Sequence, residues 1–223
     1  MRRRIEAALE GWSIPYSEGQ LERLVRYREV LEEWNRKVGL VARGEDLTDH
    51  ILDSLRGLPL LETLTGSLIA DAGSGGGLPG IPLAVFQPRR RFVLVERSAK
   101  KAGFLRYAAA AAGLDNVEVA GRGLEELETI FDGVVFRALG ELGRYFDLLL
   151  RVTLPGGWLL GYKGRFDTAL AEMDGLDMKG VSTDLIPAPP VPGPGTNPGS
   201  SGDAGGASGT GEKERSFLIV RKV

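Results

Sequence analysis

One short glycine-rich segment constrains the fold of this chain more than any other feature. The run Asp71-Ala72-Gly73-Ser74-Gly75-Gly76-Gly77 follows a short apolar stretch at 67–70 and precedes a helical pattern at 81–86. Glycine lets the backbone turn sharply and approach a ligand without a Cβ in the way. The first amides of the helix then face that ligand. A strand, a glycine turn and a helix in this order predict an α/β fold that binds a nucleotide or a nucleoside.

The rest of the chain supports an α/β assignment. Before residue 60 the pattern is helical, with Ser17 and Gln20 at capping-box spacing at the start of a helix over 17–38. After residue 60, short apolar segments alternate with helical ones, which predicts a mostly parallel sheet covered on both faces. We therefore expect a helical N-terminal extension over 1–60 and an α/β domain over 61–223. Strands are expected over 67–70, 91–95, 117–120, 133–136, 158–162 and 216–222, and an extended segment over 178–186. Helices are expected over 47–55, 81–86, 99–112, 141–152 and 166–173, and a turn at 155–157 (Pro-Gly-Gly).

Residues 187–213 differ from the rest in composition. After Pro187-Ala188-Pro189-Pro190 the segment consists almost wholly of Gly, Pro, Ser, Ala, Thr, Asn and Asp. Such a composition has too little apolar surface to offset the entropy lost on ordering. We expect a flexible insertion between the last two strands. An inert loop is favoured over an arm that touches the substrate.

Composition excludes several kinds of chemistry. The chain has no cysteine and a single histidine, His50, which leaves no thiolate nucleophile, no disulfide and no basis for a metal site. The net charge is −2, so any nucleic-acid surface must be local. No secretory signal and no apolar run of membrane-spanning length is recognisable. We expect a cytoplasmic monomer with no membrane association.

Asp71 and Pro79, in and beside the glycine run, help to distinguish between two classes of cofactor. Residues 75–80 also match the G-x-G-x-x-G pattern of dinucleotide sites. Asp71 would repel a diphosphate there but could orient an ammonium group, and Pro79 removes an amide that a diphosphate would use. Glu96, at the end of the next strand, could accept hydrogen bonds from ribose hydroxyls in either class of cofactor. These features favour a methionine-containing nucleoside over a dinucleotide.

Several short sequence motifs occur in an order typical of one protein family. The most specific motif is the Leu-Pro-Gly-Ile-Pro run at 78–82, and the motifs together span about residues 30–165. In these motifs the chain resembles the glucose-inhibited division protein B family, the guanine-N7 methyltransferases of small-subunit (16S) ribosomal RNA. The matching motifs lie at 34–37 (WNRK), 50–55 (HILDSL), 71–83 (DAGSGGGLPGIPL), 100–105 (KKAGFL), 124–126 (LEE), 137–138 (RA) and 163–164 (KG).

The resemblance implies a class I S-adenosylmethionine-dependent methyltransferase, Rossmann-like with a seven-stranded, mostly parallel sheet. It implies S-adenosylmethionine as cofactor, and small-subunit ribosomal RNA, alone or within the assembled subunit, as partner. By motif position, Gly73 and Leu78 would touch the cofactor, Leu124 and Glu125 would flank its adenine, and Arg137 would lie between cofactor and substrate. The cofactor-binding residues expected are Asp71, Gly73, Gly75, Gly77, Leu78, Glu96, Leu124, Glu125 and Arg137.

The residues at hand suit methylation at guanine N7. That atom has a free lone pair and no proton, so the reaction needs no general base and no covalent intermediate. Arg137 and Lys163 follow expected strands, at the edge where open α/β sheets bind ligands. We assign both to catalysis, as groups that orient the guanine, with a salt bridge or a solvated side chain as the alternatives. His50 and Asp53 share a helix face and are expected to line the RNA pocket, or else to be a packing pair.

Two other functions remain open. One is an NAD-dependent oxidoreductase, although His50 lies upstream of the glycine run. The other is a non-catalytic S-adenosylmethionine-binding factor in ribosome assembly. The chain departs from the family pattern at Phe136 and Tyr162, which would fit a changed pocket. Methyl transfer to small-subunit RNA would distinguish an enzyme from both.

Overall fold

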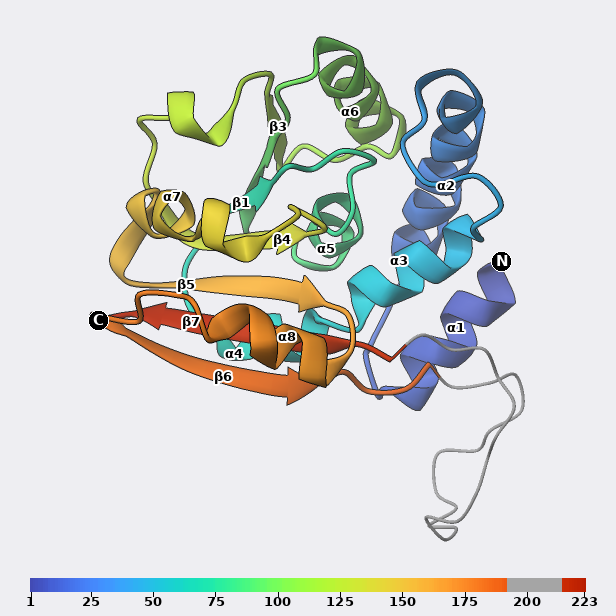
Figure 1. The fold of residues 1–223 in the computed structure, drawn as a ribbon. Coiled ribbons are helices and arrows are strands. Elements are labelled where there is room, and N and C mark those ends of the chain that lie inside the picture. Colours follow the sequence, from blue (N-terminus) through green and yellow to red (C-terminus); the bar gives the residue numbers. More distant parts are fainter. Residues whose placement is uncertain (192–213) are drawn as a thin grey trace, which may run out of the picture.

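A single twisted sheet organises the molecule (Figure 1). The computed structural model describes residues 1–191 and 214–223, and the larger part of the insertion expected over 187–213 lies outside them. The sheet has seven strands in the order β3-β2-β1-β4-β5-β7-β6. The strands are β1 (Leu68–Ala72), β2 (Arg91–Val95), β3 (Val117–Ala120), β4 (Phe131–Arg137), β5 (Thr153–Lys163), β6 (Val181–Pro187) and β7 (Ser216–Lys222).

Strand direction confirms the expected fold class. Strands β1 to β5 pair in parallel with one another, and β7 is antiparallel to both of its neighbours, β5 and β6. Parallel strands need crossovers between them, and helices supply most of these. The α-helices are α1 (Arg2–Gly11), α2 (Glu18–Val38), α3 (Leu47–Leu55), α4 (Leu58–Thr63), α5 (Gly80–Phe86), α6 (Ala99–Ala111), α7 (Phe146–Arg151) and α8 (Phe166–Met173), with 3-10 turns η1 (Leu124–Glu126) and η2 (Leu142–Arg144).

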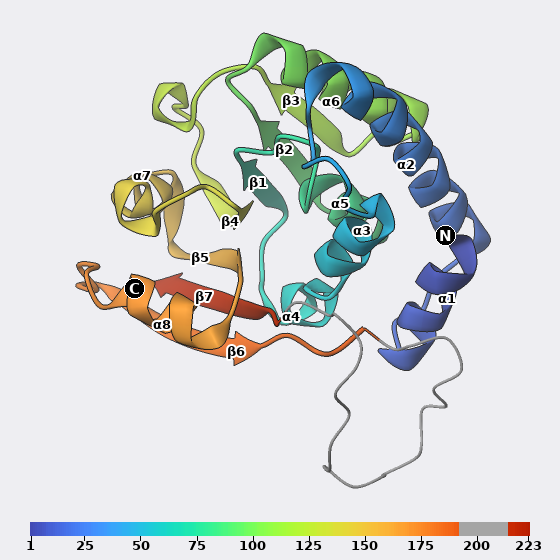
Figure 2. The same ribbon diagram turned by 45° about the vertical axis from the view of Figure 1, so that its right-hand side comes forward.

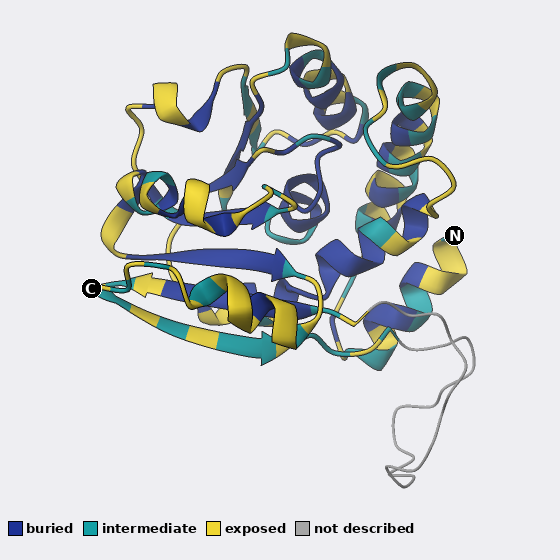
Figure 3. Ribbon diagram, viewed as in Figure 1, coloured by how far each residue is buried: buried dark blue, intermediate teal, exposed yellow. Residues whose placement is uncertain are grey.

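The central strands of the sheet are mostly buried, whereas the edge strands β3 and β6 are partly exposed (Figure 3). Along β2, Phe92 and Leu94 point into one hydrophobic cluster, whereas Val93 and Val95 point into a second. Helices α1 to α6 contribute to the first cluster, and η1, η2, α7 and α8 to the second. This two-sided burial explains why the strands read as continuous apolar runs rather than alternating ones.

The N-terminal helices pack directly on the sheet's helical layer. Helix α2 begins with the predicted capping box, in which the Ser17 hydroxyl and the Gln20 side chain each bond the other's backbone N–H. It lies beside α5 and α6, and Figure 2 shows it crossing next to α6. Residues of α1 and α2 share one hydrophobic cluster with β1 and β2. The division into an extension over 1–60 and a domain over 61–223 stays a prediction.

Two predicted elements differ from the structure. The helix expected over 141–152 is interrupted at Tyr145 into η2 and α7. The turn expected at 155–157 lies inside β5, where Thr153 pairs with Phe131 and Trp158 with Gly133, so a bulge absorbs the extra residues. Among the described residues, no helix is long and apolar enough to cross a membrane.

Candidate active site

A cavity of about 460 Å³ opens at the carboxyl ends of β1, β4 and β5. Its walls come from the glycine turn after β1, the segment between α2 and α3, helix α3 and the residues that follow β4 and β5. Open α/β sheets bind their ligands at this edge. Seven of the residues singled out from the sequence line it: His50, Asp53, Gly73, Gly75, Leu78, Arg137 and Lys163.

The glycine turn follows a path that side chains would obstruct. Gly73, Gly75 and Gly77 have φ values of 69°, 53° and 82°, in the left-handed region that glycine tolerates best. A Cβ on Gly73 would lie 2.6 Å from Cδ2 of Leu139. At Gly75 the nearest atom to such a Cβ would be the Gly73 carbonyl oxygen at 3.7 Å, so this stretch of backbone presents a bare surface to the cavity.

Helix α2 braces this turn from behind. The Tyr27 hydroxyl, fully buried, donates a hydrogen bond of 2.5 Å to the carbonyl oxygen of Gly76. On the other side, the Ser74 N–H donates to the Val95 carbonyl at 3.0 Å, and the Ser74 hydroxyl donates to the Asp71 carbonyl at 2.8 Å. The conformation of the turn is therefore fixed by partners on α2, β1 and β2.

Asp71 lies beneath the turn and does not line the cavity. Its Oδ2 accepts a 3.0 Å hydrogen bond from the Gly80 N–H, whereas Oδ1 is buried and has no hydrogen-bond partner within the described part of the chain. Burial raises the pKa of Asp71 to about 7, and the Gly80 N–H opposes that rise. An orphaned carboxylate oxygen favours a cationic group nearby, because a cation would stabilise the charged form.

The other cofactor residues expected from the sequence lie outside the cavity lining. Glu96 accepts hydrogen bonds from the N–H groups of Gly75 (3.1 Å) and Ser98 (2.8 Å), so it supports the turn rather than facing open space. Leu124 is buried and Glu125 is exposed, both in η1. Gly77 is packed against Ile81. Their contacts with a cofactor stay predictions.

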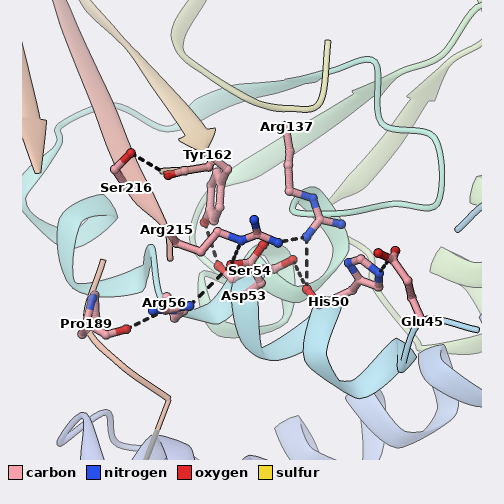
Figure 4. Close-up of polar contacts among 11 residues, drawn as sticks. Glu45, His50, Asp53, Ser54, Arg56, Arg137, Tyr162, Pro189, Arg215 and Ser216 are labelled. Atoms are coloured by element: carbon pink, nitrogen blue, oxygen red, sulfur yellow. Dashed lines mark hydrogen bonds and ion pairs between the residues drawn. The ribbon is translucent and has the colours of Figure 1, made fainter. Parts of the chain in front are cut away.

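Asp53 organises the charged wall of the cavity (Figure 4). Its Oδ2 lies 3.2 Å from Nη1 of Arg137, and its Oδ1 lies 3.0 Å from Nε of Arg215 and 3.8 Å from Nη1 of Arg56. Arg137 also donates to the His50 carbonyl at 3.4 Å. Asp53 is 7% exposed, and two of its guanidinium partners, Arg137 and Arg215, line the cavity, so this part of the wall has more positive than negative charge. That excess suits an anionic or electron-rich ligand.

The remaining predicted substrate residues have partners of their own. Nε2 of His50 lies 2.8 Å from Oε2 of Glu45, and burial together with the nearby Arg137 lowers the pKa of His50. Lys163 pairs with Glu172 at 2.5 Å and lies 5.6 Å from the centre of the Phe136 ring. His50 on α3, Lys163 at the end of β5 and Arg137 at the end of β4 all line the cavity.

The sequence alone missed two functional residues. Arg215 lines the cavity, but it follows the low-complexity segment and matches no quoted motif. Tyr27 was overlooked on the apolar face of α2, where a single phenol among leucines was the available signal, since buried tyrosines usually bond through their hydroxyl. No cluster of His, Cys, Asp or Glu among the described residues could hold a metal ion.

Sheet order, glycine turn and cavity together define the class of protein, a class I methyltransferase. Solved structures share the fold: an O-methyltransferase from Bacillus cereus in complex with SAH superposes with a TM-score of 0.59 at 19% identity, covering 94% of this chain and 93% of that one. The O-methyltransferase TomG from Streptomyces achromogenes, in complex with SAM, gives a TM-score of 0.56 at 18% identity, with coverage of 93% and 91%.

The sequence comparisons identify the family. The chain belongs to the GidB family, rRNA small subunit methyltransferase G, whose model matches residues 20–182. Ribosomal RNA small subunit methyltransferase G from Hydrogenovibrio crunogenus is 40% identical over 159 residues, 69% of this chain and 72% of that protein. The enzyme of the same name from Ralstonia nicotianae is 34% identical, covering 85% and 91%. The resemblance seen in the sequence is confirmed.

Proposed function

We propose that this protein methylates N7 of a guanine in 16S ribosomal RNA, with S-adenosylmethionine as methyl donor. It acts as a monomer in the cytoplasm, on RNA that is either free or within the assembled small subunit. The observation that carries the proposal is the joining, in one cavity, of the bare glycine turn with the Arg137–Asp53 pair, in a chain of the GidB family.

The chemistry requires alignment more than proton transfer. The lone pair of N7 forms a bond to the methyl carbon while the carbon–sulfur bond breaks and its electron pair returns to sulfur. Neither step moves a proton, so the cavity needs no general base. Holding two reactants in line supplies much of the rate, and this is a task for rigid walls. His50 is assigned to the cavity wall, because this reaction has no proton for its imidazole to remove.

Each part of the cavity has a role in that alignment. The turn at Gly73 and Gly75 gives close backbone approach for the cofactor, with Asp71 beneath it to favour the ammonium of the methionine moiety. Arg137 donates toward the O6 and N7 edge of guanine or to an adjacent phosphate, as arginine does elsewhere. Lys163, which also lines the cavity, assists in orienting the base.

Methyl transfer provides the direct test. Purified protein, radiolabelled S-adenosylmethionine and either naked 16S RNA or assembled small subunits should yield labelled 7-methylguanosine on nucleoside analysis. Arg137→Ala should lower kcat/KM by about 100-fold or more, the scale for loss of one donor aimed at the reacting group. Arg144→Ala, an exposed arginine on η2, is the matched control and should leave turnover unchanged.

Two outcomes would defeat the proposal. Label found in another nucleoside would move the reaction to a different atom. Tight binding of S-adenosylhomocysteine with no transfer to either RNA form would instead favour a non-catalytic role in ribosome assembly.

A further inference from the structure

The exposed cations of this protein are divided sharply between paired and unpaired sets. Two of the three N-terminal arginines are paired with acids, Arg2 with Glu6 and Glu18 and Arg4 with Asp46 and Asp49, whereas Arg3 forms no ion pair with any residue that the structure describes. On α2, Arg26, Arg28 and Lys37 are also paired, with Glu29, Glu32 and Glu33. A patch built on those residues would be largely neutral.

Other exposed cations form no ion pair among the described residues. Four of them lie close in sequence to the cavity lining: Arg36, Arg43, Arg97 and Lys100. Each lies within four residues of a residue that lines the cavity, namely Leu40, Ala42 or Lys101. We call these four, together with Lys101, the α2–α6 surface, since they lie at the end of α2, in the segment after it and at the start of α6.

The two stretches of sequence that carry this surface contain no acids, although Glu33, Glu45 and Glu96 flank them. Neither residues 34–44 nor residues 97–114 include an aspartate or glutamate. Lys100 and Lys101 stand in the first turn of α6, where the helix dipole disfavours cations. These two lysines therefore do not stabilise the helix through its dipole. We interpret them as groups that bind an external anion.

The opposite side of the cavity has the reverse character. Residues 123–147 contain six acids and two cations, Arg137 and Arg144, and both cations are paired. On α8, Arg165 pairs with Asp167. Figures 1 and 2 show α2 and α6 adjacent to each other, with α7 and α8 at the other side of the molecule. A polyanion approaching the cavity is attracted on the side of α2 and α6 and repelled on the side of α7 and α8.

An aromatic ring accompanies the cations. Tyr107 on α6 is 50% exposed, and its ring lies 5.9 Å from that of Trp34 on α2. Lys100 and Tyr107 are seven residues apart, so they lie on the same stripe of the helix. Cations that track a backbone beside an exposed aromatic ring are the usual combination of single-strand nucleic-acid binding surfaces.

We propose that the α2–α6 surface binds the phosphate backbone of the RNA that flanks the target guanine, so that the RNA enters the cavity over α2 and α6 and leaves the α7–α8 side uncovered. This inference rests on the proposed function for the identity of the RNA. It adds the direction of approach and the residues that contact phosphates, none of which is the Arg2–Arg4 group.

A charge-neutralised variant tests the surface without using methyl transfer. Arg36→Gln, Arg43→Gln and Lys100→Gln combined remove three exposed cations, none of which lines the cavity. Binding of a fluorescent 16S RNA transcript should weaken by about tenfold or more near physiological salt. The slope of log Kd against log salt should fall by about two to three, close to one for each lost phosphate contact.

The matched control removes the same charge elsewhere. Arg144→Gln, Arg165→Gln and Arg221→Gln combined lose three exposed cations whose partners are surface acids. The control should keep the wild-type affinity and slope. S-adenosylhomocysteine affinity, measured by calorimetry, should be the same in all three proteins. Thermal melting confirms that each variant is folded.

Three outcomes would overturn the inference: no change in the surface variant, an equal loss in both variants, or a loss confined to the control. A different result would assign the surface to a membrane instead. In that case the wild type would bind anionic phosphatidylglycerol vesicles, and the surface variant would lose this binding while its RNA affinity stayed unchanged. Because the readout is binding, failure of this inference leaves the methyl-transfer test untouched. Loss of RNA binding in the surface variant would stand even if no methyl were transferred.

Discussion

The Tyr27 hydroxyl donates a 2.5 Å hydrogen bond to the carbonyl oxygen of Gly76, linking α2 to the glycine turn 49 residues away in sequence. Tyr27 is fully buried, and burial raises its pKa, so it remains a neutral donor throughout the physiological range. The N-terminal helices therefore contribute directly to the shape of the cavity. This hydrogen bond couples the packing of α2 to the conformation of the glycine turn.

Tyr27→Phe should weaken both folding and cofactor binding. The substitution leaves the Gly76 carbonyl without its donor, and an unsatisfied buried group costs about 1–3 kcal/mol in the free energy of unfolding. The turn also loses its support, so the Kd for S-adenosylhomocysteine should rise. Urea denaturation and calorimetry measure the two effects. Tyr107→Phe, at an exposed site on α6, is the control. Equal losses of stability and affinity in both variants would show that the hydrogen bond to Gly76 does not support the turn.

Asp71 should make the stability of the protein depend on pH. Burial raises its pKa from 3.8 to about 7 in the folded state. Between these values the folded state holds a proton that the unfolded state has released, so stability falls as pH rises from about 4 to about 7 and then levels off. The shift corresponds to about 4 kcal/mol at most.

Asp71→Asn should remove this dependence. The variant should be more stable than the wild type at pH 8, and the difference should shrink toward pH 4 because the wild-type carboxyl is then neutral as well. Its affinity for S-adenosylmethionine should fall, since an amide cannot balance an ammonium charge. Chemical denaturation across the pH range measures the difference in free energy. A difference of constant size at every pH would contradict the raised pKa.

Much of the fold could be predicted because its signals are local. The strands β2, β3 and β7 and the helix α8 have the bounds expected from apolar runs and helical spacing. The break between η2 and α7 was missed because apolar periodicity continues across Tyr145, and the only local hint is Gly143, which weakens a helix. The bulge in β5 was read as a turn because Pro155 and two glycines are typical of turns.

The site was predictable only in its components. The glycine turn is continuous in sequence, and its motif identifies it. Asp53 and Arg137 are 84 residues apart, and Arg215 is 162 residues from Asp53, so their convergence depends on how α3 packs at the ends of β4 and β7. Spacing along the chain carries no information about such contacts. The pairing of Lys163 with Glu172 has the same origin, since Glu172 comes from α8.

Asp53→Asn should destabilise the charged wall of the cavity. The carboxylate is 7% exposed and faces Arg56, Arg137 and Arg215, and Arg56 is itself 5% exposed. Asp53→Asn removes the carboxylate that these arginines share, and breaking a buried ion pair by removing one partner costs about 3–5 kcal/mol. Thermal and urea unfolding should reveal the loss. Asp184→Asn, which breaks the exposed pair with Arg221, is the control and should cost about 1 kcal/mol or less. Similar costs for the two would mean that Asp53 is not the organising charge.

Two glycines of this chain should respond to alanine in opposite directions. Gly103 lies within α6 and has open space where a Cβ would be, so Gly103→Ala should stabilise the protein by about 0.5–1 kcal/mol through the helix preference of alanine. Gly77 has a φ of 82°, and a Cβ there would lie 2.6 Å from Cδ1 of Ile81. Gly77→Ala should therefore cost about 1–2 kcal/mol for the left-handed backbone alone, and more from the clash.

Only the Gly77 substitution should also weaken S-adenosylhomocysteine binding, because only Gly77 lies in the turn. Calorimetry and urea denaturation of both variants give the four values, and a Gly77→Ala variant with unchanged stability and affinity would mean that the turn does not need its left-handed glycine at this position.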